Sequence, residues 1–280
     1  MAESRNPFLR RELGDQGYAT FNPAPSQTAT VDAAGAQTTP QQLQEMYDRT
    51  TTGQRMTIDD VVVKTSILFL ILLAGATVGW VAGNSLLTFG SMIAALVLGL
   101  MISFKRTVNV PAIAAYALLE GVFLGGISLF YQDYVDQASE TGDGPNIVLQ
   151  AVLGTLVAFG VMLALYKTGR LRATPKFQKM FMVALFSYLG IAVVSLISAL
   201  FGVGGGWGFY GVGPLGIALC ALGVALASFS LVLDFDAIEQ GINVGLPEPE
   251  SWRMGFGLMV TLVWLYLELL RLLAILNSSD

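Results

Sequence analysis

Seven apolar stretches, each about as long as a membrane-crossing helix, limit what this chain can fold into more than any other feature. A run of about 20 apolar residues crosses the hydrocarbon core of a bilayer as one helix. The runs lie near residues 61–83, 86–104, 110–132, 147–166, 180–203, 214–239 and 255–276. Only 12% of the residues are charged, against about 25% in soluble domains. The sequence predicts an all-α protein that crosses the lipid bilayer seven times.

The first 56 residues have a different composition and form a separate region. The segment "FNPAPSQTATVDAAGAQTTPQQ" is too polar to bury a core, so we expect it to be disordered. No apolar core follows a basic start, which excludes a signal peptide. We therefore divide the chain into a tail, residues 1–56, and a transmembrane domain, residues 57–280. The tail is either a solvated segment or a segment that binds a partner.

The loops between the spans differ in basic residues, and this difference predicts the orientation. Basic residues follow the second span (Lys105 and Arg106) and the fourth span (Lys167, Arg170, Arg172, Lys176 and Lys179). The loop between them, "YQDYVDQASETGDGPN", has acids and no base. Because short loops rich in Lys and Arg stay in the cytoplasm, we expect a plasma-membrane protein with its N-terminus in the cytoplasm and its C-terminus outside. The alternative is six crossings and a last helix that crosses only partly, since Glu268 and Arg271 make this span the most polar.

Missing residue types exclude most enzymes. The chain has no histidine and one cysteine, Cys220, in an apolar span. A Ser–His pair and a His- or Cys-based zinc site are therefore excluded. Asp234 and Asp236 lie on one helix, whereas an intramembrane aspartyl protease needs its two acids on facing helices. We expect no enzymatic activity, no cofactor and no nucleic-acid partner.

Glu120 is an acid near the middle of the third span. At 1.5 Å per residue it lies about 15 Å from the start of that helix. Its neighbours Gly121, Gly125 and Gly126 are typical of close helix packing. Because ionisable residues at this depth are costly and usually functional, Glu120 is either a structural anchor, hydrogen-bonded across helices, or a residue of an ion path.

The last two spans carry the remaining acids. Asp234 and Asp236 are two residues apart, so they point to nearly opposite sides of their helix. From its depth we expect Asp236 to face the bundle interior beside Thr261, and Asp234 to be the more dispensable of the two acids. One stripe of the last span contains Thr261, Trp264, Leu265, Glu268, Arg271 and Leu272. Glu268 and Arg271 either neutralise each other or contribute to an ion path.

Several motifs together resemble those of the Bax inhibitor-1 family of multi-span proteins. They are "AYALLEGVFLGGISLF", "FSLVLDFDAIE" and "LYLELLRLLAILNSSD", and "MTIDDVVVKT" is similar to the actinobacterial branch of the family. The resemblance covers about residues 57–280. It implies a seven-helix bundle whose polar last helix is wrapped by the other six. Well-studied relatives are calcium leak channels with a pH-sensitive gate of two carboxylates on the last two helices.

The family gate matches this chain only in part. By this resemblance the first carboxylate is Asp236, a candidate calcium ligand, and the second position is Thr261, which is not an acid. Arg271 matches an arginine that pairs with an acid in the second span, but here that span has no acid. The resemblance and the oxygen ligands that Ca²⁺ prefers predict a pH-sensitive cation leak with Ca²⁺ as permeant ion. The alternative is a non-conducting regulator of another membrane protein, such as a membrane protease.

Overall fold

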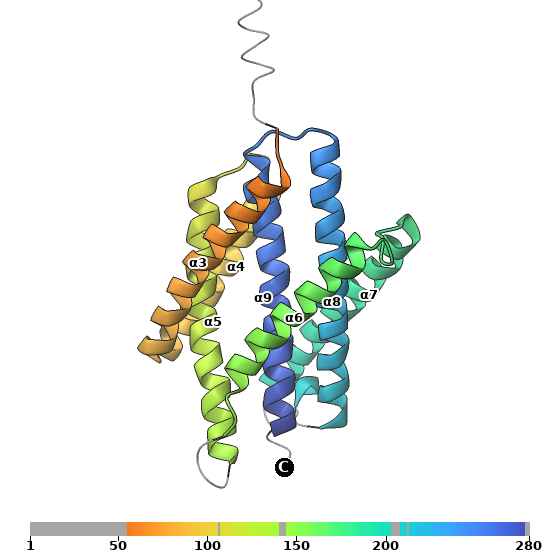
Figure 1. The fold of residues 1–280 in the computed structure, drawn as a ribbon. Coiled ribbons are helices and arrows are strands. Elements are labelled where there is room, and N and C mark those ends of the chain that lie inside the picture. The colour runs from red at the N-terminus through yellow and green to blue at the C-terminus, as the bar shows by residue number, and fades with distance from the viewer. Residues whose placement is uncertain (1–54, 106, 140–143, 203–207, 212, 278–280) are drawn as a thin grey trace, which may run out of the picture. The chain divides into compact units, whose positions relative to one another are not determined.

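Seven long helices make up most of the computed structural model, which describes residues 55–105, 107–139, 144–202, 208–211 and 213–277 (Figure 1). They are α3 (Ile58–Ala82), α4 (Ser85–Phe104), α5 (Val110–Ala138), α6 (Ile147–Lys167), α7 (Pro175–Leu200), α8 (Pro214–Asn243) and α9 (Glu250–Asn277), with a short 3₁₀ helix, η2 (Gly208–Tyr210), before α8. All 7 are long and apolar enough to cross a membrane. The predicted all-α, seven-span fold is confirmed. Residues 1–54 of the predicted disordered tail lie outside the described residues.

Several helices run past the predicted spans, and polar side chains support the extension of α5. On α5, Gln132 donates to Asp136 at 2.9 Å and accepts from the backbone N–H of Ile147 at 3.1 Å. These bonds join the end of α5 to the start of α6. At the other end of the chain, α9 begins at Glu250 rather than at residue 255 and contains 28 residues. Its length and composition suit a full crossing, so the structure favours seven crossings over six.

The last helix is the centre of the bundle (Figure 1). Helices α3, α5, α6 and α8 pack directly against α9, while α4 packs on α5, and α7 packs on α8 and η2. Each of the four buried apolar clusters includes residues of α9, among them Met259, Leu265, Leu270 and Ile275. The predicted central position is confirmed. The expected wrapping by all six other helices is borne out only in part: α4 and α7 lie further from α9 than the other four helices, and α7 reaches it through side chains such as Tyr188.

Glycines bring the backbones of α3 and α5 into direct contact. A Cβ atom added at Gly121 would lie 2.1 Å from the carbonyl oxygen of Leu72, and one at Gly125 would lie 2.0 Å from that of Ala76. At Gly79 it would lie 2.1 Å from the carbonyl oxygen of Val122. Small residues allow this approach in membranes, where packing drives helix association. The packing role predicted for these α5 glycines is confirmed.

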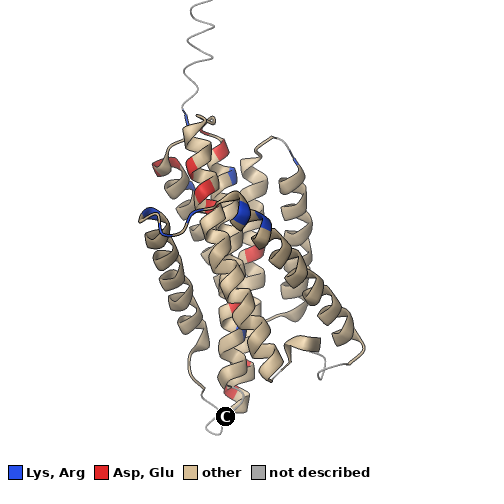
Figure 2. Ribbon diagram, turned by 90° about the vertical axis from the view of Figure 1, so that its right-hand side faces the viewer, with Lys and Arg blue, Asp and Glu red and all other residues tan. Residues whose placement is uncertain are grey.

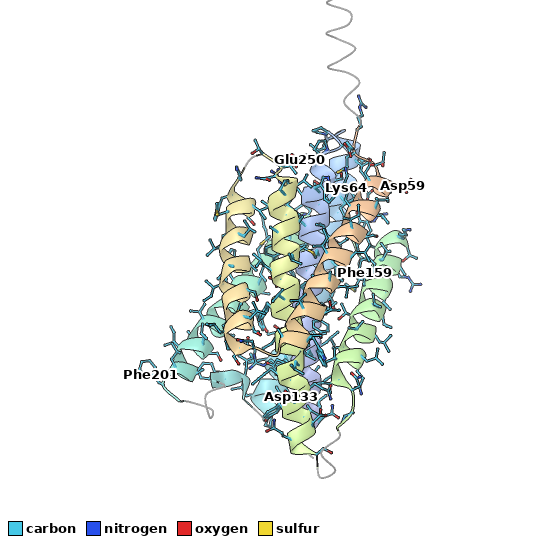
Figure 3. The ribbon with its side chains drawn as sticks, turned by 90° about the vertical axis from the view of Figure 1, so that its left-hand side faces the viewer. Asp59, Lys64, Asp133, Phe159, Phe201 and Glu250 are labelled. Atoms are coloured by element: carbon cyan, nitrogen blue, oxygen red, sulfur yellow. The ribbon has the colours of Figure 1, made fainter. Side chains whose placement is uncertain are left out.

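The described Lys and Arg residues other than Arg271 gather at one end of the bundle, which we call the basic end (Figure 2). This end contains the start of α3, the α4–α5 and α6–α7 loops and the α8–α9 connection (residues 244–249). Figure 3 shows Asp59, Lys64 and Glu250 at this end and Asp133 at the opposite end. The clustering agrees with the loop pattern in the sequence. That the basic end faces the cytoplasm stays a prediction.

Candidate functional site

Asp234 and Thr261 meet at the interface between α8 and α9. Thr261 is 6% exposed, and its hydroxyl donates to the Asp234 carboxylate. The other carboxylate oxygen, Oδ2, is buried and has no hydrogen-bond partner in the structure. A buried oxygen of this kind is costly and calls for an explanation. The expectation that Asp236 lies beside Thr261 is therefore wrong, because Asp234 has that position.

The position of Asp236 has a simple reason in helical phase. The buried residues of α8 include Cys220, Gly223, Ala227 and Leu231, and Asp234 continues this row, whereas Asp236 lies on nearly the opposite side of the helix from Asp234. Asp236 instead accepts a hydrogen bond from Gln240 at 2.5 Å, on an exposed part of α8 near the basic end. Depth alone could not distinguish the two acids, since they differ by only about 3 Å along the helix.

Beside Asp236, α8 is joined to α6. The hydroxyl of Tyr166 donates to Glu239, again on an exposed surface of the basic end. Asp236 and Glu239 thus present acids at the edge of the bundle, two and five residues beyond Asp234 along α8. They can raise the local cation concentration there without belonging to the buried pair.

Glu268 lies about two turns further along α9 and contacts α7 and α8. Its Oε1 accepts from the Tyr188 hydroxyl at 2.5 Å and from the Trp264 indole N–H at 3.1 Å. Its Oε2 is buried and has no hydrogen-bond partner in the structure. Glu268 therefore repeats the pattern of Asp234, with one oxygen held by donors and the other open.

Arg271 makes its hydrogen bond away from Glu268. Its guanidinium donates to the backbone carbonyl of Tyr210 at 2.9 Å and lies 4.4 Å from the centre of that ring. The partners of Glu268 are Tyr188 and Trp264, and no ion pair within 4.0 Å joins Glu268 to Arg271 in the described chain. The two charges still act on each other through space. Mutual neutralisation by direct contact is therefore not what holds Glu268.

Glu120 is bonded within its own helix. Its carboxylate accepts from Tyr116, one turn earlier on α5, and the Tyr116 ring packs edge-on against Phe256 of α9 at 5.0 Å. The bond across helices that the sequence suggested is therefore replaced by a bond along α5. Glu120 reaches α9 only through the aromatic contact of its partner.

A buried ion pair at the basic end was not anticipated from the sequence. Lys64 of α3, 8% exposed, pairs with Glu248 of the α8–α9 connection and donates to Ser251 at 2.8 Å. Beside it, the Met56 N–H donates to the Leu246 carbonyl at 2.8 Å, and the Met56 side chain is 2% exposed. Arg55 and Met56, which we had assigned to the tail, thus belong to the helical unit. A lysine inside a predicted first span was the signal that could have revealed this pair.

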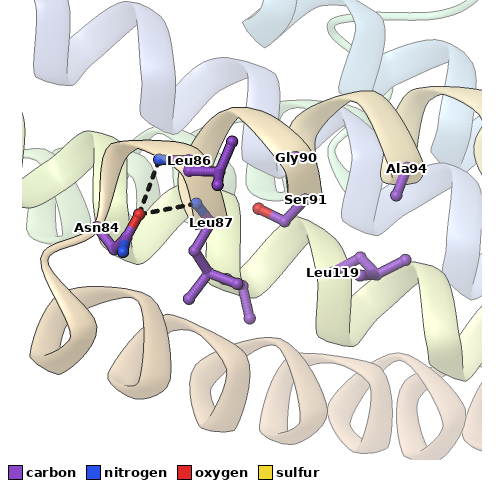
Figure 4. Close-up of a pocket in the computed structure, with 8 residues that line it drawn as sticks. Asn84, Leu86, Leu87, Gly90, Ser91, Ala94 and Leu119 are labelled. Atoms are coloured by element: carbon purple, nitrogen blue, oxygen red, sulfur yellow. Dashed lines mark hydrogen bonds between the residues drawn. The ribbon is translucent and has the colours of Figure 1, made fainter.

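The described residues contain no group of three or more His, Cys, Asp or Glu side chains that could hold a metal ion. A groove of about 460 Å³ lies on α4 and α5, lined by residues such as Leu86, Leu87 and Leu119 (Figure 4). None of the acids discussed above lines this groove. The candidate functional site is therefore the set of separate acids along α8 and α9.

Comparison with known proteins agrees with this architecture. A search of curated proteins finds no significant match. The family profile described as Bax inhibitor 1 like matches residues 22–278. The match begins inside the tail, further toward the N-terminus than the motifs in the membrane domain, and includes all seven helices. The chain therefore belongs to the Bax inhibitor 1 like family.

Proposed function

We propose that this protein is a cation leak pathway, with Ca²⁺ as a permeant ion, that follows the interface between α8 and α9. One observation supports the proposal above others. Asp234 and Glu268 each have a buried carboxylate oxygen without a hydrogen-bond partner in the structure. Intramembrane acids of this kind usually mark ion pathways. Hard cations bind oxygen ligands, so a passing cation would satisfy both oxygens.

The spacing of the two acids suits stepwise movement. Asp234 is bonded to Thr261, and Thr261 precedes Glu268 by seven residues, a rise of about 10 Å along α9. Conduction needs sites that attract an ion but also release it, and several weak sites in series do this better than one strong site. The absence of a multi-acid cluster from the described residues agrees with weak, separate sites.

We also propose that this leak depends on pH. An ionised carboxylate attracts a cation, and a protonated one does not. Flux should therefore fall as the pH is lowered. Asp234 is bonded to a threonine hydroxyl, whereas in a two-carboxylate channel two acids would share a proton. The pH dependence of the flux should therefore be shallower than in such a channel.

Ion flux in proteoliposomes tests the proposal. The purified protein, with a Ca²⁺ indicator inside the vesicles, should admit Ca²⁺ faster than empty vesicles across a pH series. Asp234→Asn should reduce the flux and flatten its pH dependence. Asp236→Asn is the matched control and should change both much less, because Asp236 bonds to Gln240 and not to Thr261. Equal effects of the two variants would contradict the assignment of the pathway.

The second candidate function is a non-conducting regulator of another membrane protein. One contact favours it: Arg55 and Met56, which follow the tail directly, pair with Pro247 and Leu246 of the α8–α9 connection. A partner bound to the tail would therefore act on the connection between the two acid-bearing helices. Absence of flux from folded protein at every pH would leave this candidate ahead.

A further inference from the structure

The carboxylate of Glu268 is held by donors from two helices. Tyr188 of α7 and Trp264 of α9 both donate to Oε1, at 2.5 Å and 3.1 Å. Oε2 is buried without a hydrogen-bond partner in the structure. Two donors on one oxygen withdraw negative charge from the group and fix its orientation. Only the second oxygen is left to face an ion.

A glycine of α8 makes this arrangement fit. A Cβ atom at Gly223 would lie 2.5 Å from Cδ of Glu268 and 2.6 Å from the hydroxyl of Tyr188. Both distances are well below van der Waals contact, so the carboxyl group and the phenol occupy the space that any side chain at this position would need. Three helices thus build one compact site around Glu268.

Aromatic rings and a positive charge surround the site in the described part of the chain. Tyr188 is 6% exposed, and its ring packs on Tyr210 at 6.2 Å and on Trp264 at 6.1 Å. Arg271, one turn further along α9, is the basic group whose charge acts on Glu268. The titratable groups on which both charges act are Tyr131 of α5, Tyr210 of η2 and Cys220 of α8. The two donated hydrogen bonds and the positive charge of Arg271 weaken the attraction of Glu268 for a cation.

We infer that Tyr188 is a positioning residue that keeps the affinity of Glu268 for a cation low enough for the ion to leave, and that Gly223 provides the space for this contact. The inference rests on the proposed leak. A site that binds too tightly traps its ion and slows conduction. Without the Tyr188 hydroxyl, the carboxylate keeps more negative charge and can turn both oxygens toward the ion.

Concentration-dependent flux measures the effect. For Tyr188→Phe, we expect the half-saturating Ca²⁺ concentration to fall by about tenfold, the low end of the range expected for losing a hydrogen bond to a charged group. The maximal flux should fall as well, since the ion leaves more slowly. Tyr266→Phe is the matched control, because its hydroxyl lies 2.6 Å from that of Ser128 and contacts no acid. The control should leave the half-saturating concentration unchanged, and an equal change in both variants would overturn the inference.

A second pair of variants tests the glycine. Gly223→Ala should displace the carboxylate and change the half-saturating concentration, whereas Gly257→Ala, on α9, adds its methyl group in open space and should not. Because the methyl group of Gly223→Ala also crowds the packing of three helices, the conclusion rests on Tyr188→Phe, which removes one oxygen atom and keeps the ring. An unchanged concentration in folded Gly223→Ala would contradict the role of this glycine.

Ion binding in detergent separates this inference from the proposed function. Of the four tryptophans, Trp80, Trp207 and Trp252 are replaced by Phe, so that the emission reports on Trp264 beside Glu268. CaCl₂ should change this emission at lower concentration in Tyr188→Phe than in its parent, and should not change it in Glu268→Gln. Flux without any response of Trp264 would refute the site at Glu268 and leave the leak standing. A response without flux would refute the leak and keep the site.

Discussion

Breaking the ion pair between Lys64 and Glu248 should destabilise the protein unequally from its two sides. The Lys64 side chain is 11% exposed and that of Glu248 is 33% exposed. Removing one partner of a buried pair costs about 3–5 kcal/mol because it leaves an uncompensated charge. Glu248→Leu leaves the buried ammonium with Ser251, a backbone carbonyl and the Trp252 ring, so we expect a loss of about 2–3 kcal/mol, at or below the low end of that range. Lys64→Met leaves a carboxylate that water can reach, so about 1 kcal/mol should be lost.

The double variant Lys64→Met, Glu248→Leu should recover most of the loss, because an apolar pair of similar volume often replaces a buried ion pair without penalty. Unfolding free energies in detergent, measured for all four proteins, should give a coupling energy of at least about 2 kcal/mol. The matched control is the pair Arg253–Glu250, also near the basic end but at i,i+3 on α9 and more exposed on its basic side. Its coupling should stay below about 1 kcal/mol. Coupling in the Lys64 pair no larger than in the control would refute the reasoning.

Two further predictions concern packing and orientation. Gly121→Ala should destabilise the protein by about 1–3 kcal/mol, since its methyl group would overlap a backbone carbonyl of α3. The control Gly160→Ala adds a methyl group in open space and should change the midpoint of thermal unfolding little. Equal shifts of the midpoint in both variants would contradict the close packing of α3 and α5. In a Cys220→Ala background, a cysteine introduced at Ser139 should react with an impermeant thiol reagent added outside intact cells, and one at Thr174 should not. The opposite labelling pattern would mean that the chain has the opposite orientation in the membrane.

The membrane spans and the central position of the last helix could be predicted, because each follows from the pattern of apolar and polar residues along one helix. Apolar length sets where a helix crosses. The polar stripe of Thr261, Glu268 and Arg271 marks a face that lipid does not accept. The glycines of α5 were also readable, since close backbone approach in a membrane requires small residues. The contacts of Gly121 and Gly125 with α3 bear this out.

The identity of the inward-facing acid and the buried ion pair could not be read in the same way. Depth gave the wrong acid, although the spacing from Gly223 and Ala227 to Asp234 was visible in the sequence and indicates the buried face. The pair of Lys64 and Glu248 joins residues 184 positions apart. Its second member lies in a loop whose path depends on tertiary packing. Likewise, the bond from Tyr188 to Glu268 depends on the relative rotation of α7 and α9, which no single helix specifies.

Two isosteric substitutions of buried threonines should separate the Asp234–Thr261 bond from simple packing. Thr261→Val removes the hydroxyl that donates to Asp234 and leaves a buried carboxylate without this partner, which should cost about 1–3 kcal/mol. Thr65 of α3 is equally buried, at 7% against 6% exposure, but its hydroxyl has no hydrogen-bond partner in the structure. Thr65→Val should therefore be neutral or slightly stabilising, since it replaces an unsatisfied polar atom by a methyl group.

The background of Asp234→Leu supplies the decisive comparison. Without the carboxylate, Thr261→Val removes a hydroxyl that no longer has an acid to support, so its cost in unfolding free energy should largely disappear. Thr65→Val should have the same effect in both backgrounds, because Thr65 belongs to the contact between α3 and Gly255 of α9 rather than to the acid. If Thr261→Val costs the same with and without Asp234, the hydroxyl does not hold the carboxylate, and Asp234 loses the contact that makes it the inward-facing acid of α8.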